Sequence, residues 1–119
     1  MKRNWDLIRL ILLNLEGETD TENLNDYSDN EVLYHVQLLL DKQLIADCQV
    51  KTYIGGQQAL IGQGRLTFEG HDFLDKIRNE TVWTHIKSQI CKVGDSLTYS
   101  IIDKLATLAF NNFLDRVLT

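Results

Sequence analysis

Apolar residues recur at steps of three and four along the first part of the chain. This spacing is typical of an amphipathic helix, which we expect from about Lys2 to Leu15. Gly17 is expected to end it, because glycine readily adopts the left-handed conformation that closes many helices. The residues on its apolar face are Trp5, Ile8, Ile11, Leu12 and Leu15.

A second helix is expected from Asp29 to Lys42. Ser28 precedes it and Glu31 follows three residues later, the spacing of a capping box. Its apolar stripe consists of Val32, Val36, Leu39 and Leu40. Between the two helices, Leu24 and Tyr27 are expected in a short extended piece.

The pattern then changes to the period of two that is typical of strands. We expect Ile45 to Thr67 to form an antiparallel hairpin, with strands ending near Ile54 and starting again near Ala59. Gly55-Gly56 predicts a tight turn, because glycine tolerates positive φ. Gly62 and Gly64 predict a bulge or kink in the second strand.

The hairpin is expected to run directly into a third helix. Thr67 can cap a helix that begins near Phe68 and ends near Arg78-Asn79. Glu69 and Asp72 place negative charge in its first turn, which favours the helix dipole. The expected buried face consists of Phe68, Phe73, Leu74 and Ile77.

Two more helices are expected at the C-terminal end. Thr81, Val82, Trp83, Ile86 and Ile90 indicate a helix closed by Gly94. A long helix from Leu97 to about Leu118 follows, capped by Ser96 or Asp95. Its broad apolar face consists of Leu97, Ile101, Ile102, Leu105, Leu108, Ala109, Phe113, Leu114 and Val117, widened by Phe110 and Leu118. Two alternatives stay open: the helix folds back onto the first helix and the Trp83 helix, or part of it pairs with another chain.

The expected fold class is α+β and mostly helical. The order helix, helix, β-hairpin, helix is that of a winged-helix-like domain with a C-terminal helical extension. In this interpretation the hairpin is the wing and the helix over 29–42 holds the position of the recognition helix. We expect a single domain over 1–119, with a winged-helix body over 1–80 and C-terminal helices over 81–119.

The stretch "RLTFEGHDFLDKIRNETVW", Arg65 to Trp83, resembles the signature of a family of small phage and prophage proteins, a domain of unknown function with an RLTWEGHEFLD-type motif. "MKRNWDLIRLILLNLE" and "VLYHVQLLLDKQLI" resemble it as well. The resemblance implies a winged-helix-like fold and no established activity, catalytic residue or ligand. One departure from DNA-binding winged helices is that Leu15 to Ser28 leaves hardly any room for the usual middle helix.

The charge distribution argues against a simple DNA-binding surface. The net charge is −5, and residues 1–40 hold three basic residues against eight acidic ones. Nucleic-acid binders usually show a basic stripe, and Asp29, Glu31 and Asp41 share the helix that would be the recognition helix. The residues on which DNA binding would depend are Asn30, Tyr34, Gln37, Lys42 and Lys51.

No arrangement of residues in the sequence predicts chemistry. His35, His71 and His85 lack metal-ligand spacing, and we expect structural or surface roles for them. Cys48 and Cys91 are expected to be small buried apolar residues. We expect no enzyme activity, no catalytic or metal-binding residue, no cofactor and no small-molecule substrate. The apolar runs are too short to span a bilayer, and the low cysteine content favours the cytoplasm.

The expected function is therefore the binding of another macromolecule. The first hypothesis is a protein-interaction module, with a homodimer or a protein partner held by the C-terminal helix. The alternative is a DNA-binding transcriptional regulator that uses the helix over 29–42 and the wing. The interface residues of the first hypothesis are Ile101, Leu105, Leu108, Phe110, Phe113 and Val117.

Overall fold

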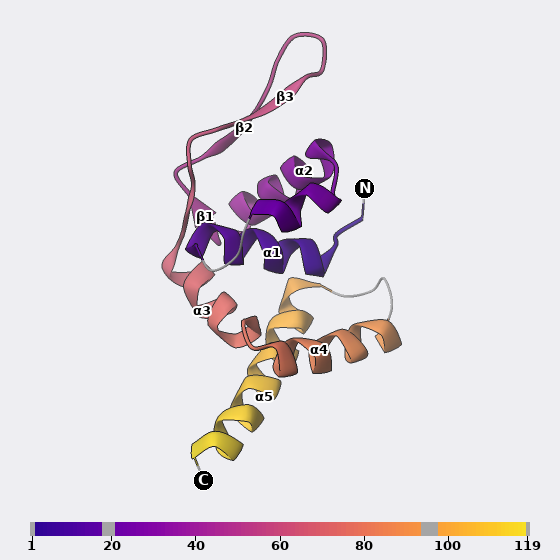
Figure 1. Ribbon diagram of the computed structural model, residues 1–119, viewed down its shortest axis with the longest axis vertical. Helices are drawn as coiled ribbons and strands as arrows, with labels where there is room; N and C mark the ends of the chain where they lie inside the picture. The colour runs from indigo at the N-terminus through magenta and orange to yellow at the C-terminus, as the bar shows by residue number, and fades with distance from the viewer. Residues whose placement is uncertain (1, 18–20, 94–97, 119) are drawn as a thin grey trace. The chain divides into compact units, whose positions relative to one another are not determined.

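The computed structural model describes residues 2–17, 21–93 and 98–118 of the chain. These residues form α-helices and two small antiparallel sheets, so the α+β, mostly helical class is confirmed (Figure 1). The chain divides into two compact units, Met1–Asp72 and Phe73–Thr119.

Helix α1, Trp5–Glu16, opens the first unit. The side chain of Asn4 caps it by accepting from the Leu7 N–H at 3.2 Å, and Gly17 closes it at φ 82°. The expected cap at Gly17 is therefore confirmed. Leu7, Ile8, Ile11 and Leu12 are buried along one side of α1, because their spacing of three and four places them on one face.

The segment after α1 differs from the expected extended piece. Thr21–Asp26 forms a 3₁₀ helix, η1, and the Tyr27 N–H donates to the Leu24 carbonyl oxygen at 3.1 Å. Leu24 and Tyr27 are three residues apart, and a 3₁₀ helix has three residues per turn. Both half-buried side chains can therefore project from the same side of the turn.

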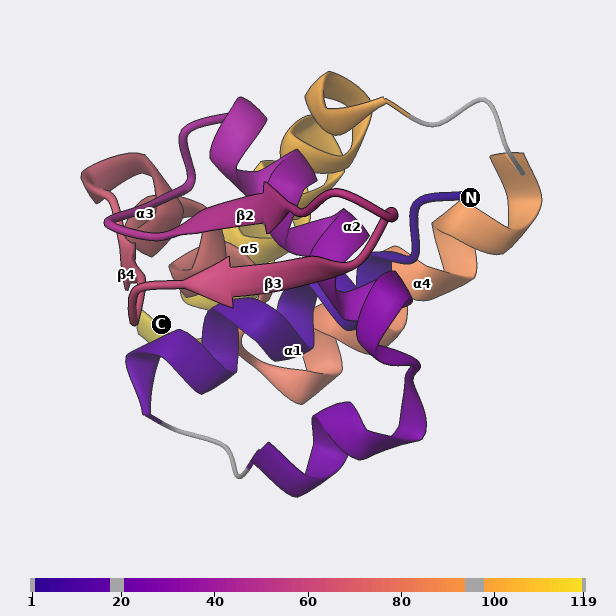
Figure 2. The same cartoon turned by 90° about the horizontal axis from the view of Figure 1, so that it is seen from above.

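Helix α2, Asp29–Asp41, lies within one residue of its expected bounds. The Ser28 hydroxyl accepts from the Glu31 N–H at 3.2 Å, which is one half of the expected capping box. Leu33, Val36 and Leu39 are buried. Helices α1 and α2 lie side by side beneath the hairpin (Figure 2).

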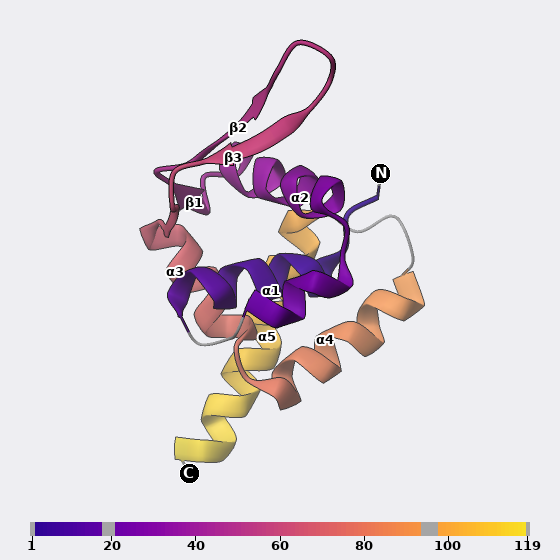
Figure 3. The same cartoon turned by 45° about the horizontal axis from the view of Figure 1, so that its top comes forward.

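The expected hairpin is confirmed, although its two arms are each split into two short strands. β2, Gln49–Thr52, pairs with β3, Gln58–Ile61, while β1, Ile45–Ala46, pairs with β4, Arg65–Leu66. Gly55 and Gly56 form the tip with φ of 100° and 89°. The predicted irregularity at Gly62 lies between β3 and β4, where a Cβ would approach the Asp47 carbonyl oxygen to 2.7 Å. The hairpin contacts α2 and its tip extends beyond it (Figure 3).

A set of backbone-centred contacts joins the end of α2 to the start of α3, Phe68–Ile77. The Thr67 N–H donates to the Leu44 carbonyl oxygen at 3.0 Å, and the Thr67 hydroxyl donates to the Gln43 carbonyl oxygen at 2.7 Å. The same hydroxyl accepts from the Gly70 N–H at 3.0 Å. The expected capping role of Thr67 is thus confirmed. We call these contacts of Gln43, Leu44, Thr67 and Gly70 the Thr67 clamp.

Phe68 is not part of the buried face of α3, contrary to expectation. It is 83% exposed, whereas Phe73, Leu74 and Ile77 are buried as expected. Phe68 is the first residue of the helix. The close contact between α3 and the turn after α2 is made by Thr67 and Gly70 of the Thr67 clamp. The Phe68 side chain is therefore left in solvent.

The second unit contains the end of α3 together with α4, Glu80–Val93, and α5, Tyr99–Leu118. The Asn79 side chain caps α4 by accepting from two backbone N–H groups. Thr98 caps α5 by accepting from the Ile101 N–H at 3.3 Å. The caps expected at Gly94, Asp95 and Ser96, and the start expected at Leu97, lie outside the described residues.

Helices α4 and α5 pack on each other through apolar side chains. The buried residues of the unit are Phe73, Leu74, Ile77, Val82, Trp83, Ile86, Ile102, Ala106 and Ala109. At the end of α3, the Lys76 ammonium lies 2.9 Å from an Asp103 carboxylate oxygen, and the Phe73 ring lies 5.0 Å from the Tyr99 ring. These two contacts connect α3 to α5.

His35 connects α1 to α2 inside the first unit. It is fully buried, its Nδ1 lies 2.7 Å from the Glu31 carbonyl oxygen, and its Nε2 accepts from the Asn4 N–H at 2.8 Å. A carbonyl can only accept and a backbone N–H can only donate. The ring is therefore the neutral tautomer with its proton on Nδ1, and it holds the residue that caps α1.

The Thr67 clamp predicts that residue 70 must be glycine. In Gly70→Ala the added Cβ would overlap the Leu44 carbonyl oxygen. Alanine favours a helix by about 1 kcal/mol over glycine, so a loss of stability would come from the overlap. We expect the free energy of unfolding to fall by about 2 to 3 kcal/mol, measured by urea denaturation.

Gly56→Ala is the matched control, because a Cβ at the hairpin tip meets no neighbour. The only expected loss in the free energy of unfolding, about 1 kcal/mol, comes from placing alanine in a left-handed backbone conformation. A Gly70→Ala protein as stable as Gly56→Ala would show that the clamp is not closely packed.

The His35 contacts predict a second large effect. His35→Leu places an apolar side chain in the core but leaves the N–H of the half-buried Asn4 without its acceptor. We expect a loss of about 2 kcal/mol in the free energy of unfolding. His71→Leu, at an exposed position, should change it by less than about 0.5 kcal/mol. Equal urea midpoints for the two variants would contradict the role given to His35.

Candidate interaction surfaces

The exposed face of α2 carries acidic residues, and these are unfavourable on a helix that would lie against DNA phosphates. Asp29, Asn30, Gln37 and Asp41 are exposed on this helix. The Gln37 side-chain amide donates to an Asp41 carboxylate oxygen at 2.8 Å. The amide that would read a base edge is therefore bound to an acid of its own helix, and that acid would face the phosphates.

The other residues predicted for DNA binding are spread over the helix and the hairpin. Tyr34 is half-buried and packs edge-on against His35, with the ring centroids 5.3 Å apart. Lys42 lies at the C-terminal cap of α2. Lys51 is exposed on β2, and its ammonium lies 5.3 Å from the centroid of the Tyr53 ring. Asn30, Tyr34 and Gln37 follow steps of four and three and so share one face of α2, on which Tyr34 is half-buried.

The hairpin is an exposed, weakly charged surface. Tyr53, Ile54, Leu60 and Ile61 are exposed on it, with Ile54 fully in solvent at the tip. Residues 48–64 contain one lysine and no acidic residue. The hairpin therefore differs in charge from the acidic helix against which it packs.

Two stripes of mostly apolar residues run along α5, and each residue of one stripe directly precedes a residue of the other in the sequence. Ile102, Ala106, Ala109 and Phe113 follow one stripe, of which the first three are buried. The second, which we call the outer stripe, consists of Ile101, Leu105, Leu108 and Asn112. Ile101 is 39% exposed and Leu108 is 63% exposed, while Leu105 is half-buried and Asn112 is exposed.

The structure thus separates the six predicted interface residues into two groups. Ile101, Leu105 and Leu108 share the outer stripe, because steps of four and three return to the same face of a helix. Phe110, Phe113 and Val117 follow steps of three and four on another face, and Phe113 also continues the stripe of Ile102, Ala106 and Ala109. Phe110 and Phe113 are half-buried, and Val117 is 61% exposed near the end of α5. The breadth of the apolar pattern in the sequence could not show this division.

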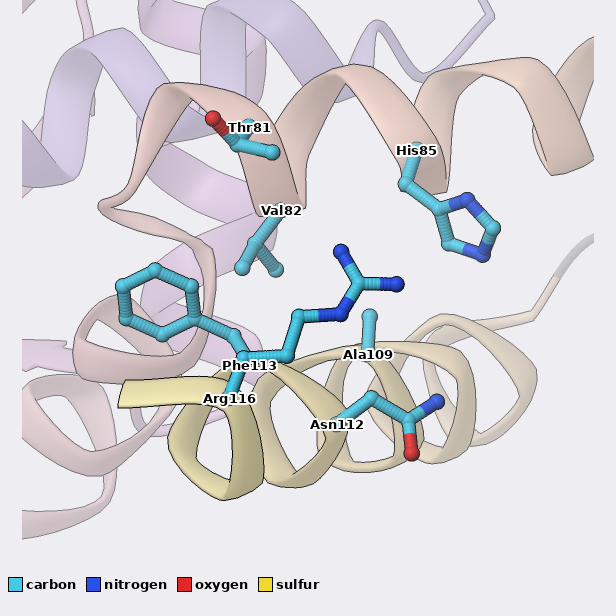
Figure 4. Close-up of a pocket in the computed structure, with 7 residues that line it drawn as sticks. All are labelled: Thr81, Val82, His85, Ala109, Asn112, Phe113 and Arg116. Atoms are coloured by element: carbon cyan, nitrogen blue, oxygen red, sulfur yellow. The ribbon is translucent and has the colours of Figure 1, made fainter. Parts of the chain in front are cut away.

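A shallow pocket of about 160 Å³ lies between α4 and α5. Val82, Ala109 and Phe113 supply apolar side chains, and the polar lining residues are Thr81, His85, Asn112 and Arg116. Figure 4 shows the Arg116 guanidinium extending from α5 toward α4, on the side of His85. An apolar floor with several hydrogen-bonding groups is typical of a binding surface. Sequence reasoning missed this pocket, because its residues come from two helices.

The two cysteines are free thiols in different settings. Cys48 is half-buried at the root of the hairpin, whereas Cys91 is exposed on α4, contrary to the expected burial. Burial raises the pKa of the Cys48 thiol, and the neighbouring Asp47 carboxylate raises it further. Cys48 is therefore kept as a neutral thiol, which is a weak nucleophile.

Among the residues that the structure describes, no group of three or more His, Cys, Asp or Glu side chains is arranged to hold a metal ion. Over the same ranges no helix combines the length and the apolar character needed to cross a bilayer.

The sequence is similar to a protein of Haemophilus influenzae that is named only as an uncharacterized protein. The two are 35% identical over 120 residues, which is 96% of this chain and 99% of the relative. No solved structure matches the chain. Residues 2–96 match the model of a family described as "Hypothetical protein (DUF2513)". The match covers most of the chain and includes the Arg65 to Trp83 motif, so the chain belongs to this family of unknown function.

Proposed function

We propose that this protein is a non-enzymatic protein-interaction module that associates through the outer stripe of α5, first of all with a second copy of itself. The observation that carries the proposal is the exposure of Ile101 and Leu108 on a helix whose other apolar stripe is buried. One apolar stripe suffices to pack a helix against its neighbour. A second stripe in solvent therefore suggests a partner.

The spacing of the outer stripe supports a helical partner. Ile101, Leu105, Leu108 and Asn112 follow steps of four, three and four, which is the a/d spacing of a helix-pairing seam. A single Asn at such a seam fixes register at some cost in stability. The stripe covers about three turns, so we expect a reversible dimer of modest affinity.

The setting of this module is part of the same proposal. The two free thiols support a reducing compartment such as the cytoplasm. The phage or prophage origin stays a prediction that depends on the resemblance of the Arg65 to Trp83 motif.

We propose as a second candidate a winged-helix-like DNA-binding regulator. The order α1, η1, α2 and hairpin supports it, since η1 supplies a short element where the middle helix of such a domain lies. The hairpin without acids favours this candidate, and the Gln37–Asp41 hydrogen bond on α2 argues against it. We therefore place the DNA contact on the hairpin and rank this candidate second.

The dimer is tested by light scattering coupled to size-exclusion chromatography. The wild-type protein should show twice the chain mass at high micromolar concentration. Leu108→Glu should be monomeric, because a buried carboxylate at the centre of the seam weakens pairing by about 2 kcal/mol or more, over tenfold in Kd.

Ser100→Glu is the control, since it adds the same charge at an exposed position of α5 that is not three or four residues from any residue of the stripe. It should keep the wild-type mass. A wild-type protein that stays monomeric at high micromolar concentration would reject the homodimer.

DNA binding is tested by mobility shift with the duplex upstream of the protein's own gene. The second candidate predicts a shift that weakens as salt rises and is reduced several-fold by Lys51→Glu. Lys92→Glu makes the same charge change at an exposed position of α4 and should bind like wild type. Affinity no higher than for random duplex at low salt would exclude this candidate.

A further inference from the structure

A cavity of about 140 Å³ lies at the root of the hairpin, within the first unit. Its apolar walls come from α1, α2 and β3 and include Ile11, Leu15, Val32, Val36 and Leu60. Cys48 contributes its thiol at the point where the hairpin begins. We call this cavity the root pocket.

The apolar lining of the root pocket is only partly covered. Leu60 is 44% exposed, and Leu15 and Val32 are half-buried. Apolar walls that water still reaches are stabilised by an apolar occupant. Cavities of this size can hold one: a cavity of ~150 Å³ lined by Leu, Ile and Phe side chains binds benzene.

Two polar groups on the lining narrow the chemistry of the occupant. Asn14 and Gln63 line the pocket. Asn14 is half-buried and Gln63 is exposed, and within residues 2–17, 21–93 and 98–118 their side-chain amides make no hydrogen bond to protein. An amide offers both a donor and an acceptor. An occupant with one hydroxyl group could satisfy either amide while its ring contacts the apolar walls.

The Cys48 thiol is also compatible with an uncharged, mostly apolar occupant. This thiol behaves as a small apolar group and a weak hydrogen-bond donor. The raised pKa of this thiol keeps it uncharged at neutral pH. In the part of the chain that the structure describes, no lysine, arginine or carboxylate side chain contributes to the lining.

We infer that the root pocket is a binding site for a compact aromatic molecule that carries a single hydroxyl group, such as a phenol. The inference depends on the geometry of the first unit alone. It is independent of the outer stripe of α5, so the failure of one leaves the other standing.

The two cysteines provide the experiment. In Cys91→Ser protein the rate of Cys48 alkylation by iodoacetamide reports access to the pocket. Millimolar phenol should slow this rate several-fold, whereas the uncharged polar solute glycerol at the same concentration should not. In wild-type protein, the exposed Cys91 thiol should react at the same rate with and without phenol, which controls for an effect on the reagent.

A variant that fills the pocket makes the test specific. Leu60→Trp places a ring over the cavity and should abolish the protection of Cys48 by phenol. Tyr53→Trp places the same indole ring at an exposed position of the hairpin, outside the lining residues. Phenol should still protect Cys48 in this variant. Circular dichroism checks that both variants are folded.

Methyl chemical shifts give a readout that does not depend on the thiol. Phenol should shift the methyl signals of Val36 and Leu60 in a saturable way and leave that of Leu108 unchanged. Two results would overturn the inference: Cys48 alkylation unaffected by phenol up to its solubility limit, or protection that persists unchanged in Leu60→Trp.

Discussion

The Thr67 clamp is the interaction on which the first unit depends. One threonine donates its N–H to the Leu44 carbonyl, donates its hydroxyl to the Gln43 carbonyl and accepts from the Gly70 N–H. These contacts join the end of α2 to the start of α3, two points separated by the whole hairpin. Because both ends of the hairpin are fixed there, its strands must return in register, and β1 pairs with β4.

This constraint explains why the hairpin can be exposed without being unfolded. Its root is held by β1, β4 and the clamp, while β2 and β3 pair mostly with each other and rest on α2. The tip can therefore carry Tyr53 and Ile54 in solvent. An apolar, weakly charged tip on a fixed root is suited to binding, and the root pocket lies at the base of the same hairpin.

Much of the fold was accessible from sequence because local rules and tertiary structure agree. Gly17, Ser28, Gly55-Gly56 and Thr67 each have a local physical role, and each occupies the expected place. Local rules failed where contacts between residues distant in the sequence determine whether a side chain is buried. Phe68 is apolar and opens α3, so the sequence pattern predicted burial, yet its side chain is exposed.

The interaction surfaces were less predictable for the same reason. His35 appears unremarkable in sequence, but it accepts from a backbone N–H thirty-one residues away. The apolar positions of α5 predicted a broad face, and only packing against α4 separates the covered stripe from the exposed one. The root pocket combines residues from several elements, and no spacing along the chain could have indicated it.

Amide hydrogen exchange tests the role of the Thr67 clamp most directly. If the clamp fixes the hairpin root and α3 to α2, the Thr67 and Gly70 amides exchange as slowly as the central amides of α2, while the Gly55 amide at the hairpin tip exchanges rapidly. Thr67 and Gly70 amides that exchange as fast as the tip would show that the clamp is open in solution, and would contradict the account of the first unit.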